Sequence, residues 1–401
     1  MDRLFSAAVT FAAFCLSMAA WGMGESPRPA AVHAAAETPE AQLVNGLLDV
    51  VHNRLDSALG RIDRLLQSNP NFRLAHLVKG DILLARTRSI ATLGGGSDAP
   101  TERLEGLREE AVARVRRFRQ VVTGEKLPAY LLQLDAKQKY AVVVDAERST
   151  LYVFENRQGT PRYLADYYIS IGRNGVRKAA EGDRRTPLGV YQVVASLPKE
   201  KLADFYGDGA FPINYPNEWD RRHGRKGHGI WLHGTPSDTY SRPPMASDGC
   251  IVLSNQDLRN LTARLQVGST PVVIAERVEW VDPASLRASR KDLLSAVESW
   301  RKDWESRDMG RYLGHYSAKF SGNGLDFKQW AKQKQQVNQA KRWIKIRIGE
   351  MGAFLYPGRE QLAVVDFVQD YASSNLSQRG HKRQYWLKEG SRWKIVYEGA
   401  A

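Results

Sequence analysis

Two side chains of this 401-residue sequence have the types and spacing of a nucleophile and its base: Cys250 and, 17 positions earlier, His233. The other cysteine, Cys15, lies in an N-terminal apolar stretch that we expect to be removed on export. A lone thiol in an exported protein has no intramolecular disulfide partner and is open to oxidation. We therefore interpret Cys250 as a catalytic thiol that reacts as its thiolate.

Cysteine catalysis needs a base, a group that orients the base, and amide donors for the oxyanion that forms on the attacked carbonyl. His233 is the candidate base, and no acidic residue stands out as its orienting partner. We expect the carbonyl of Gly234 to hold the imidazole in the required tautomer instead. Gly249 leaves room beside the sulfur for a substrate carbonyl, and the amides of Gly249 and Cys250 are the expected oxyanion donors.

Simpler interpretations exist for the same residues. A lone buried cysteine is usually a small apolar core residue, and a histidine at a strand end is often only a hydrogen-bonded polar group. The polar turn at 247–249, directly before Cys250, favours the nucleophile. One cysteine with scattered histidines lacks the spacing of a zinc site, so we expect neither a metal nor another cofactor.

The residues between 134 and 278 predict a mostly β domain that positions this pair. Short β-rich runs separated by polar turns occur at 140–145, 150–154, 167–172, 189–194, 229–233 and 271–274. A single helix is expected at 255–265, where a Ser/Asn cap precedes an acidic first turn. Loops carried on a rigid sheet commonly hold catalytic groups, which fits His233 and Cys250 near strand ends.

Residues 37–125 predict a helical region, because leucines recur at spacings of three and four. The segment 58–85 resembles one tetratricopeptide-type helical hairpin, with the Asn69-Pro70 pair at its turn. A single hairpin of this kind buries little core by itself. A small helical adaptor that packs on a neighbouring domain is the alternative. We expect this region to dock a protein partner.

Residues 289–399 predict an α+β cone in which helices precede a curled antiparallel sheet. An amphipathic helix is expected at 289–310 and a second helix at 327–338. Strand-like segments follow at 343–348, 362–371, 382–387 and 393–397. The chain is therefore expected to be multidomain, with helices first, a β domain in the centre and the cone last.

The motifs around the reactive pair resemble the L,D-transpeptidase catalytic (YkuD) domain over about residues 138–276. That family carries His-Gly-Thr before a Ser-His-Gly-Cys-type motif, and this chain has His-Gly-Thr at 233–235 and Ser-Asp-Gly-Cys at 247–250. Segments 170–172 and 185–191 match the family's strand and its Thr-Pro-x-Gly-x-Phe/Tyr turn. The run 211–217 with Asp220 is similar to the branch of YafK-type proteins and cell-shape L,D-carboxypeptidases.

This resemblance implies a thioester mechanism on peptidoglycan stem tetrapeptides, and it implies carbapenem sensitivity. Cys250 would attack the carbonyl at the L-centre of diaminopimelate and release D-alanine, with His233 as the base. The thioester would pass to an amine in an L,D-transpeptidase, or to water in an L,D-carboxypeptidase or a hydrolase that frees wall-linked protein. A non-catalytic wall-binding protein that keeps the fold as a peptide clamp is a further alternative.

Two positions depart from the family pattern. The residue before the Gly-Cys pair is Asp248 instead of the usual histidine, and the Arg or Asn usually found two after the cysteine is Val252. The loss at Val252 weakens the inference of transpeptidase activity specifically, whereas Cys250 and His233 retain the acyl-enzyme chemistry.

The remaining expectations about the site also follow from the resemblance. Residues expected to contact the substrate are Ser247, Asp248, Thr235, Tyr215 and Arg185. Arg173, Arg184 and Arg185 are expected to face either a carboxylate-rich stem peptide or water. Residues 289–399 resemble a nuclear transport factor 2-like (NTF2-like) domain, whose pocket would take a glycan or peptide or would mediate dimers.

The N-terminal segment and the net charge bear on location and partners. Residues 1–36 have the short charged start, apolar core and small-residue end of a signal peptide. We expect export to the periplasm, with a membrane anchor only if this segment stays uncleaved. A formal net charge of +14 favours anionic polymers or membrane surfaces. An exported protein meets cell-wall and lipid anions before nucleic acid, so no nucleic-acid partner is expected.

Overall fold

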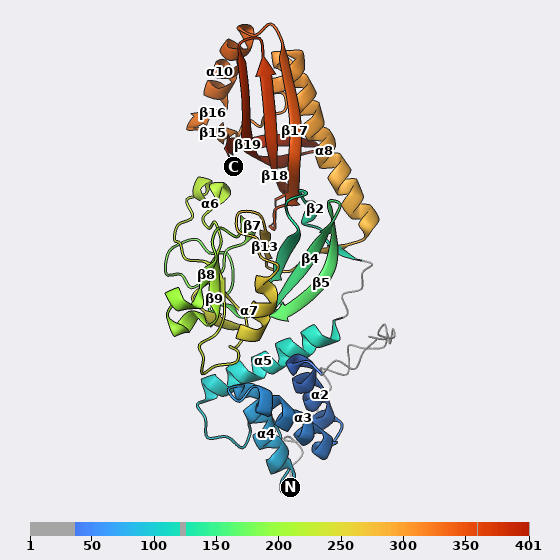
Figure 1. Cartoon of the computed structure of the whole chain (residues 1–401), viewed down its shortest axis with the longest axis vertical. Helices are drawn as coiled ribbons and strands as arrows, with labels where there is room; N and C mark the ends of the chain where they lie inside the picture. Colours follow the sequence, from blue (N-terminus) through green and yellow to red (C-terminus); the bar gives the residue numbers. More distant parts are fainter. Residues whose placement is uncertain (1–36, 121–125, 359, 401) are drawn as a thin grey trace. The chain divides into compact units, whose positions relative to one another are not determined.

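The computed structural model describes residues 37–120, 126–358 and 360–400, shown in colour in Figure 1. The expected signal peptide lies outside these residues. No helix among the described residues has the length and apolar character needed to cross a membrane. The chain forms two compact units. The first contains the N-terminal helices and the segments Ala203–Gly207 and Thr235–Ala246, and the second contains the rest of the described chain.

The first unit is built on helices α2 (Pro39–Val51), α3 (Leu55–Ser68), α4 (Arg73–Ala85) and α5 (Thr101–Arg119). Helix α2 begins where the Thr38 hydroxyl accepts the amide of Ala41 and proline occupies the first turn, both favourable at a helix start. The apolar stripes of the helices meet in one core, which includes Leu43, Ile62, Phe72, Val78 and Ile82. The helical region expected from leucine spacing is therefore confirmed.

The central part of the second unit has a five-stranded sheet in the order β5-β4-β3-β13-β7. These strands are β3 (Tyr140–Asp145), β4 (Thr150–Arg157), β5 (Thr160–Tyr168), β7 (Gly189–Gln192) and β13 (Pro271–Ala275). Pairing is antiparallel except between β3 and β13, which run parallel. Strand β3 is buried on both faces, which explains its continuous Ala-Val-Val-Val run.

A second, four-stranded sheet carries the reactive pair, in the order β12-β10-β9-β8. Its strands are β8 (Leu197–Pro198), β9 (Gly209–Pro212), β10 (Trp231–His233) and β12 (Ile251–Val252). Helix α7 (Asn255–Thr262) follows, and its first turn is capped by the Ser254 hydroxyl, which accepts the amide of Asp257. One apolar core packs both sheets and α7 together.

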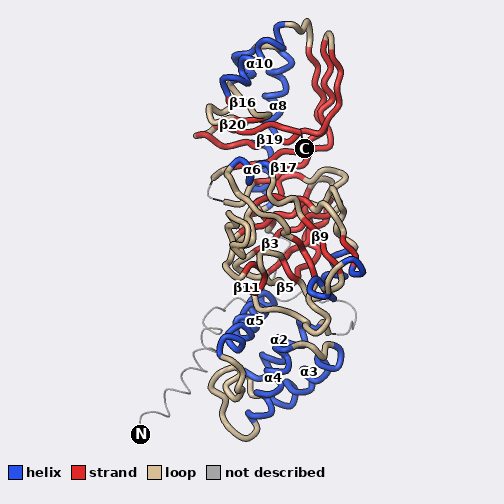
Figure 2. The backbone as a smooth tube through the Cα atoms, turned by 90° about the vertical axis from the view of Figure 1, so that its left-hand side faces the viewer, coloured by secondary structure: helices blue, strands red, loops and turns tan. Residues whose placement is uncertain are grey.

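The C-terminal part has three helices and a five-stranded sheet in the order β2-β17-β18-β19-β20. The elements are β2 (Leu131–Gln133), α8 (Pro283–Ser306), α9 (Met309–Leu313), α10 (Phe327–Gln339), β17 (Ile344–Leu355), β18 (Leu362–Ser373), β19 (Leu376–Glu389) and β20 (Arg392–Ala400). Helix α8 begins six residues earlier than expected, at Pro283, and ends before Arg307, whose φ of 61° leaves the helical region. Figure 2 shows long strands and helices gathered in this part.

Short helix α6 (Glu218–Arg222) joins the central and C-terminal parts of the second unit. Its Trp219 ring stacks on Tyr385, with centroids 5.3 Å apart, and Glu218 pairs with Arg383 at 3.0 Å. The remaining short elements are β1 (Leu127–Pro128), β6 (Ile171–Gly172), β11 (Met245–Ser247), β14 (Trp280–Val281), β15 (Ser321–Gly322), β16 (Leu325–Asp326) and two 3₁₀ turns (Lys199–Lys201, Asp204–Tyr206). The multidomain fold expected from the sequence is confirmed.

Candidate active site

The register between β10 and β12 brings the two reactive residues to one face. The strands run parallel, with Leu232 opposite Ile251 and His233 opposite Val252. Cys250 directly precedes β12, so the same register places it opposite Trp231. Side chains two residues apart on a strand point to the same face. The side chains of His233 and Cys250 therefore project from one face of neighbouring strands.

His233, the candidate base, is held by the backbone of the next residue. His233 is buried, with 1% of its surface exposed, and its Nδ1 lies 2.7 Å from the carbonyl oxygen of Gly234. A carbonyl oxygen only accepts hydrogen bonds, so Nδ1 carries the proton and Nε2 is the basic nitrogen of the neutral ring. This contact supports the orienting role expected of Gly234.

Cys250, the candidate nucleophile, lies at the end of a tight turn at residues 247–250, called the nucleophile turn below. The Ser247 hydroxyl donates to the carbonyl of Cys250 at 2.7 Å and accepts the amide of Gly249 at 3.1 Å. The Gly249 amide, expected from the sequence as an oxyanion donor, is thus engaged with Ser247 in this conformation. The Cys250 thiol lies 3.4 Å from the carbonyl oxygen of Gly229 and is partly exposed.

Glycine is required at position 249 for two reasons. Its φ of 123° is strained for any residue with a side chain, and a Cβ would lie 2.7 Å from the carbonyl oxygen of Arg185. The Thr186 hydroxyl holds the segments of Gly172 and Gly249 together, because it donates to the Gly249 carbonyl at 3.0 Å and accepts the Gly172 amide at 2.9 Å. Thr186 is fully buried. Sequence reasoning treated it only as turn geometry, although it supports the nucleophile turn directly.

The loop before Thr186 is organised around Asp183. Its carboxylate accepts the amides of Ala179, Ala180 and Arg185 and the buried ammonium of Lys178, at 2.8–3.1 Å. Burial opposes ionisation, but these donors prevail and lower the pKa of Asp183 to about 2. The sequence analysis did not identify Asp183, because nothing in its local pattern marks it as the centre of a loop.

Comparison with known proteins identifies the family to which this site belongs. Residues 138–274 match the L,D-transpeptidase catalytic domain (YkuD), and residues 292–399 match the Cds6 C-terminal NTF2-like domain. The chain is similar to the solved structure of Bd1075 from Bdellovibrio bacteriovorus, with 31% sequence identity and a TM-score of 0.61. The match covers 69% of this chain and 98% of Bd1075. The chain belongs to this family, which joins an L,D-transpeptidase catalytic domain to an NTF2-like domain. The resemblance expected from the motifs is confirmed.

A second solved structure supports the same assignment. The helical cell shape determining protein Pgp2 from Campylobacter jejuni is 26% identical, with a TM-score of 0.58 over 70% of this chain and 96% of Pgp2. Among curated proteins, none matches the sequence.

In this L,D-transpeptidase-family protein the two departures from the motif have different environments. Val252 is buried in β12 and forms a bridge with Ser170, so it offers no polar group to a substrate. Asp248 is exposed over 64% of its side chain, and its carboxylate lies 3.1 Å from Arg173 and 3.8 Å from Arg184. Cations therefore lie next to the nucleophile turn, although they come from the 173–185 loop and not from the position two after Cys250.

The other residues expected to contact substrate differ in exposure. Ser247, Thr235 and Tyr215 are all buried. Ser247 shapes the nucleophile turn, the Thr235 hydroxyl donates to the Tyr240 carbonyl at 3.3 Å, and the Tyr215 hydroxyl donates to the Lys226 carbonyl at 3.0 Å. This geometry favours supporting roles for them. Arg185 is exposed and donates to the Val176 carbonyl at 3.1 Å.

The family motif at 211–220 forms a buried polar network. Asp220 accepts the hydroxyl of Tyr191 at 3.1 Å and the guanidinium of Arg225 at 2.8 Å. Asn217 caps α6 and donates to the hydroxyl of Tyr356, at 3.0 Å, from the C-terminal part. Burial raises the pKa of Asp220, and Arg225 opposes that effect. The network connects the catalytic and NTF2-like parts without touching the thiol.

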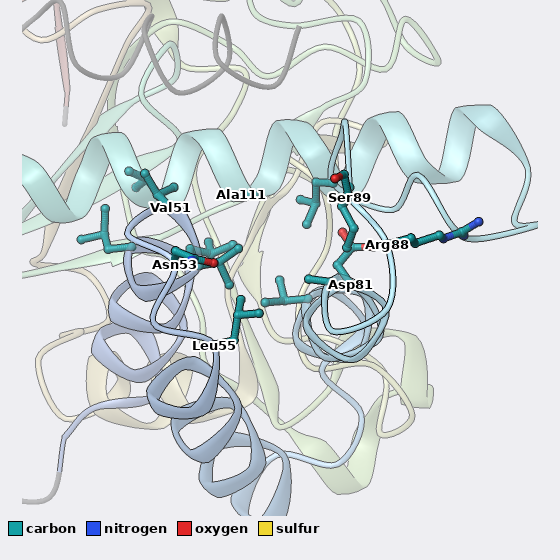
Figure 3. A pocket seen from close by; sticks show the side chains of 15 residues that line it. Val51, Asn53, Leu55, Asp81, Arg88, Ser89 and Ala111 are labelled. Carbon is teal, nitrogen blue, oxygen red and sulfur yellow. The ribbon is translucent and has the colours of Figure 1, made fainter. Parts of the chain in front are cut away.

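The helical unit holds a separate cavity of about 280 Å³ (Figure 3). Figure 3 shows Val51 and Leu55 on one side and Ala111 on another, with Asp81 and Ser89 among the few polar groups. Asp81 accepts the amide of Gly94 at 2.6 Å, and burial raises its pKa. The lining contains no cysteine or histidine, so this cavity has none of the chemistry present around Cys250. Among the described residues, no cluster of His, Cys, Asp and Glu side chains is placed to hold a metal ion.

Proposed function

We propose that the protein is a periplasmic, cysteine-dependent peptidoglycan acyltransferase of the L,D-transpeptidase type. The observation that carries the proposal is the register of β10 and β12, which supports a common face for His233, with its Nδ1 bound to a carbonyl, and the partly exposed Cys250. The family supplies the substrate class, the stem tetrapeptide of peptidoglycan. The name of Pgp2 extends the proposal to a role in cell shape.

The reaction proceeds in two halves. Nε2 of His233 takes the thiol proton while Sγ of Cys250 bonds to the carbonyl carbon at the L-centre of diaminopimelate. The amide bond to D-alanine then breaks, and the imidazolium returns the proton to the departing amine. An amine of a second stem next attacks the thioester, gives its proton to His233, and breaks the C–S bond. The proton finally returns to the thiolate.

Stabilisation of the oxyanion falls to amides of the nucleophile turn. The Cys250 amide and the Gly249 amide are the proposed donors, and Gly249 would exchange its bond to Ser247 Oγ for a bond to the oxyanion. Such donors act where charge develops and typically contribute a factor of about 10² to 10³ in rate. Arg173 and Arg184, which lie beside Asp248, supply cationic groups for the carboxylates of the stem peptide.

Water is the second candidate acceptor, which would make the enzyme an L,D-carboxypeptidase or a hydrolase of wall-linked protein. The specific observation in its favour is buried Val252, since the family's usual polar side chain at that position is missing. Product analysis separates the outcomes. Crosslinked dimers from purified tetrapeptide muropeptides mean transfer, and tripeptides alone mean hydrolysis.

Carbapenem labelling tests the acyl-enzyme step itself. The wild type is expected to gain the mass of the drug on the peptide that carries Cys250, whereas Cys250→Ala gains none. An unlabelled wild type that still binds purified peptidoglycan would favour the non-catalytic wall-binding alternative and contradict the proposal. Detection of the mature chain in the periplasmic fraction tests the expected export.

A further inference from the structure

The segment Thr235–Ala246 joins the base to the nucleophile, yet it belongs to the compact unit of the N-terminal helices. His233 ends β10 just before the segment, and Ser247 opens the nucleophile turn directly after it. Residues 235–244 have no regular secondary structure of their own. Fixing each backbone residue costs about 1–2 kcal/mol of conformational entropy, so contacts outside the catalytic sheets must offset this cost.

Aromatic stacking forms the centre of these contacts. The ring of Tyr240 stacks on Phe72, the residue before α4, with centroids 4.2 Å apart and planes inclined by 28°. Phe72 is buried in the helical core, and Tyr240 packs against the same core. A stacked aromatic pair contributes about 0.5–1.5 kcal/mol beyond the area it buries. Tyr240 is therefore the main apolar anchor of the segment.

Hydrogen bonds hold the chain at Tyr240 and just before it. The Asn71 side-chain amide donates to the Ser237 carbonyl at 2.9 Å, and the Asn71 carbonyl accepts the Tyr240 amide at 3.3 Å. Arg73 donates to the Thr239 hydroxyl at 3.3 Å. These bonds fix the path of the chain as well as the position of one ring.

A buried carboxylate on α5 provides the next anchor. The Ser241 hydroxyl donates to Glu110 at 2.6 Å, and the Arg114 guanidinium donates to the same oxygen of Glu110 at 2.9 Å. Glu110 is only 1% exposed, and burial raises its pKa. Close packing continues at Gly106, where a Cβ would lie 2.9 Å from the ring of Pro243. Three successive parts of the segment thus meet helices α4 and α5 or their ends.

We propose that the helical unit is a positioning element of the active site, and that Tyr240 and Ser241 are the positioning residues through which it acts. This inference rests on the acyl-enzyme chemistry proposed above. By fixing residues 237–243, the helices hold the stretch of chain that joins His233 to Ser247, and so keep Nε2 of His233 within reach of the Cys250 thiol. A misplacement of about 1 Å at a reacting pair costs about 10²-fold in rate.

The test compares Tyr240→Ala and Ser241→Ala with Tyr240→Phe, which keeps the stacked ring, in the full chain. Arg86→Ala is the matched control, because Arg86 pairs with Asp56 on the same helical unit and makes no contact with the segment. For Tyr240→Ala we expect kcat on tetrapeptide muropeptides to fall about tenfold or more, with KM changed less than about threefold. Tyr240→Phe and Arg86→Ala are expected to stay within about twofold of the wild type.

Iodoacetamide alkylation of Cys250 against pH, followed by mass spectrometry of its peptide, separates positioning from folding. Displacing His233 removes the base that assists the thiol, so the midpoint of the alkylation profile moves to higher pH in Tyr240→Ala. A variant that is merely less stable keeps the wild-type midpoint. A folded Tyr240→Ala with wild-type kcat and midpoint overturns the inference.

Two further outcomes are informative. If Tyr240→Ala does not fold, Ser241→Ala carries the test, since it removes one hydroxyl without opening a cavity, and an unchanged midpoint there overturns the inference. If the wild type turns over no muropeptide, the proposed function fails, but a shifted midpoint in the variants still supports the positioning role.

Discussion

The carbonyl oxygen of Gly234 lies 2.7 Å from Nδ1 of His233, so the residue after the proposed base fixes the orientation of its ring. In many enzymes a carboxylate performs this task. A neutral carbonyl fixes the tautomer without adding a negative charge, and it stabilises the imidazolium less than a carboxylate does. The position of that one carbonyl therefore decides where the basic nitrogen points.

Gly234→Ala is expected to slow carbapenem acylation about 100-fold, because a small shift of the base has a large effect on rate. A Cβ at this position would lie 2.0 Å from Oδ1 of Asn255 and 3.2 Å from the amide of Asp208. The backbone would have to move away and take the orienting carbonyl with it. Acylation is measured by mass spectrometry over time.

Gly80→Ala is the matched control, since nothing lies within 4 Å of a Cβ there and the residue is in α4. It should acylate at the wild-type rate. Adding Asn255→Ala to Gly234→Ala should restore part of the rate by removing the clash. Wild-type acylation in Gly234→Ala alone would contradict the orienting role of the carbonyl.

Asp248→Asn is expected to lower KM for tetrapeptide muropeptides about two- to fivefold, because it frees Arg173 and Arg184 from an internal carboxylate. Arg173→Gln is expected to raise KM by a similar factor. Steady-state kinetics at low and high salt measure both effects. The change in KM relative to the wild type should be smaller at high salt, because salt screens the charges.

The exposed pair Arg177–Glu276 supplies the control, Glu276→Gln, which should leave KM unchanged. The free energy of unfolding should change by less than about 1 kcal/mol in all three variants, since exposed ion pairs contribute little. A higher KM in Asp248→Asn would mean instead that Asp248 binds a cationic group of the substrate.

Asp183 makes the 173–186 loop sensitive to acid. Its pKa falls from 3.8 to about 2 on folding, so its contribution to stability is complete above about pH 4 and is lost as pH falls through about 2. Asp183→Asn should remove this contribution at neutral pH, where the wild type is expected to be the more stable protein. Urea unfolding at several pH values between 6 and 2 measures the difference.

The difference in the free energy of unfolding between the wild type and Asp183→Asn should narrow steadily as the pH falls. Carboxylates elsewhere in the chain titrate in both proteins and cancel in the difference. A gap that stays constant down to pH 2 would show that the ionised carboxylate of Asp183 does not stabilise the loop.

Glu398 is expected to be essential for the stability of the NTF2-like part. This buried carboxylate accepts hydrogen bonds from Lys382 at 2.7 Å, Gln384 at 2.8 Å and Tyr316 at 3.0 Å. Burial opposes its ionisation, but the charges of Lys382 and Lys334 prevail and lower the pKa of Glu398 to about 2. Glu398→Ala should cost about 3–5 kcal/mol, because it leaves the cationic partners without their counter-charge. Urea unfolding gives the measurement.

Glu298→Gln serves as the comparison, since Glu298 pairs with Arg301 on the more exposed side of α8. Glu298→Gln should lower the free energy of unfolding by less than about 1 kcal/mol. Equal costs in the two variants would mean that burial of Glu398 adds nothing to the strength of its interactions.

Local patterns were enough to predict most of the elements and to propose His233 and Cys250 as the reactive pair. The β-branched run of β3 reports burial on both faces, and the leucine spacing of the N-terminal helices reports burial of one face. Both patterns depend on residues close together in the chain. Strand β5 was recognised only at its end, because most of it is half-exposed and carries polar residues. Strand β19 is longer than expected for the same reason, because its first half is exposed and polar. Strand β17 is longer because Gly349 and Gly352, at an irregularity of its register, interrupt the β-rich pattern before its buried end.

The sequence by itself determined the family of the catalytic domain and the candidate reactive pair, because the order His-Gly-Thr, then Gly-Cys, lies within short motifs. Only the tertiary structure decided what holds them. The bond from Asn71 to Ser237 joins residues 166 positions apart, and Tyr240 reaches Phe72 across a similar separation. Contacts of this kind depend on how distant segments fold onto one another, and neither hydrophobic period nor local spacing records them. The chemistry is therefore readable from neighbouring residues, whereas its support comes from residues far apart in the chain.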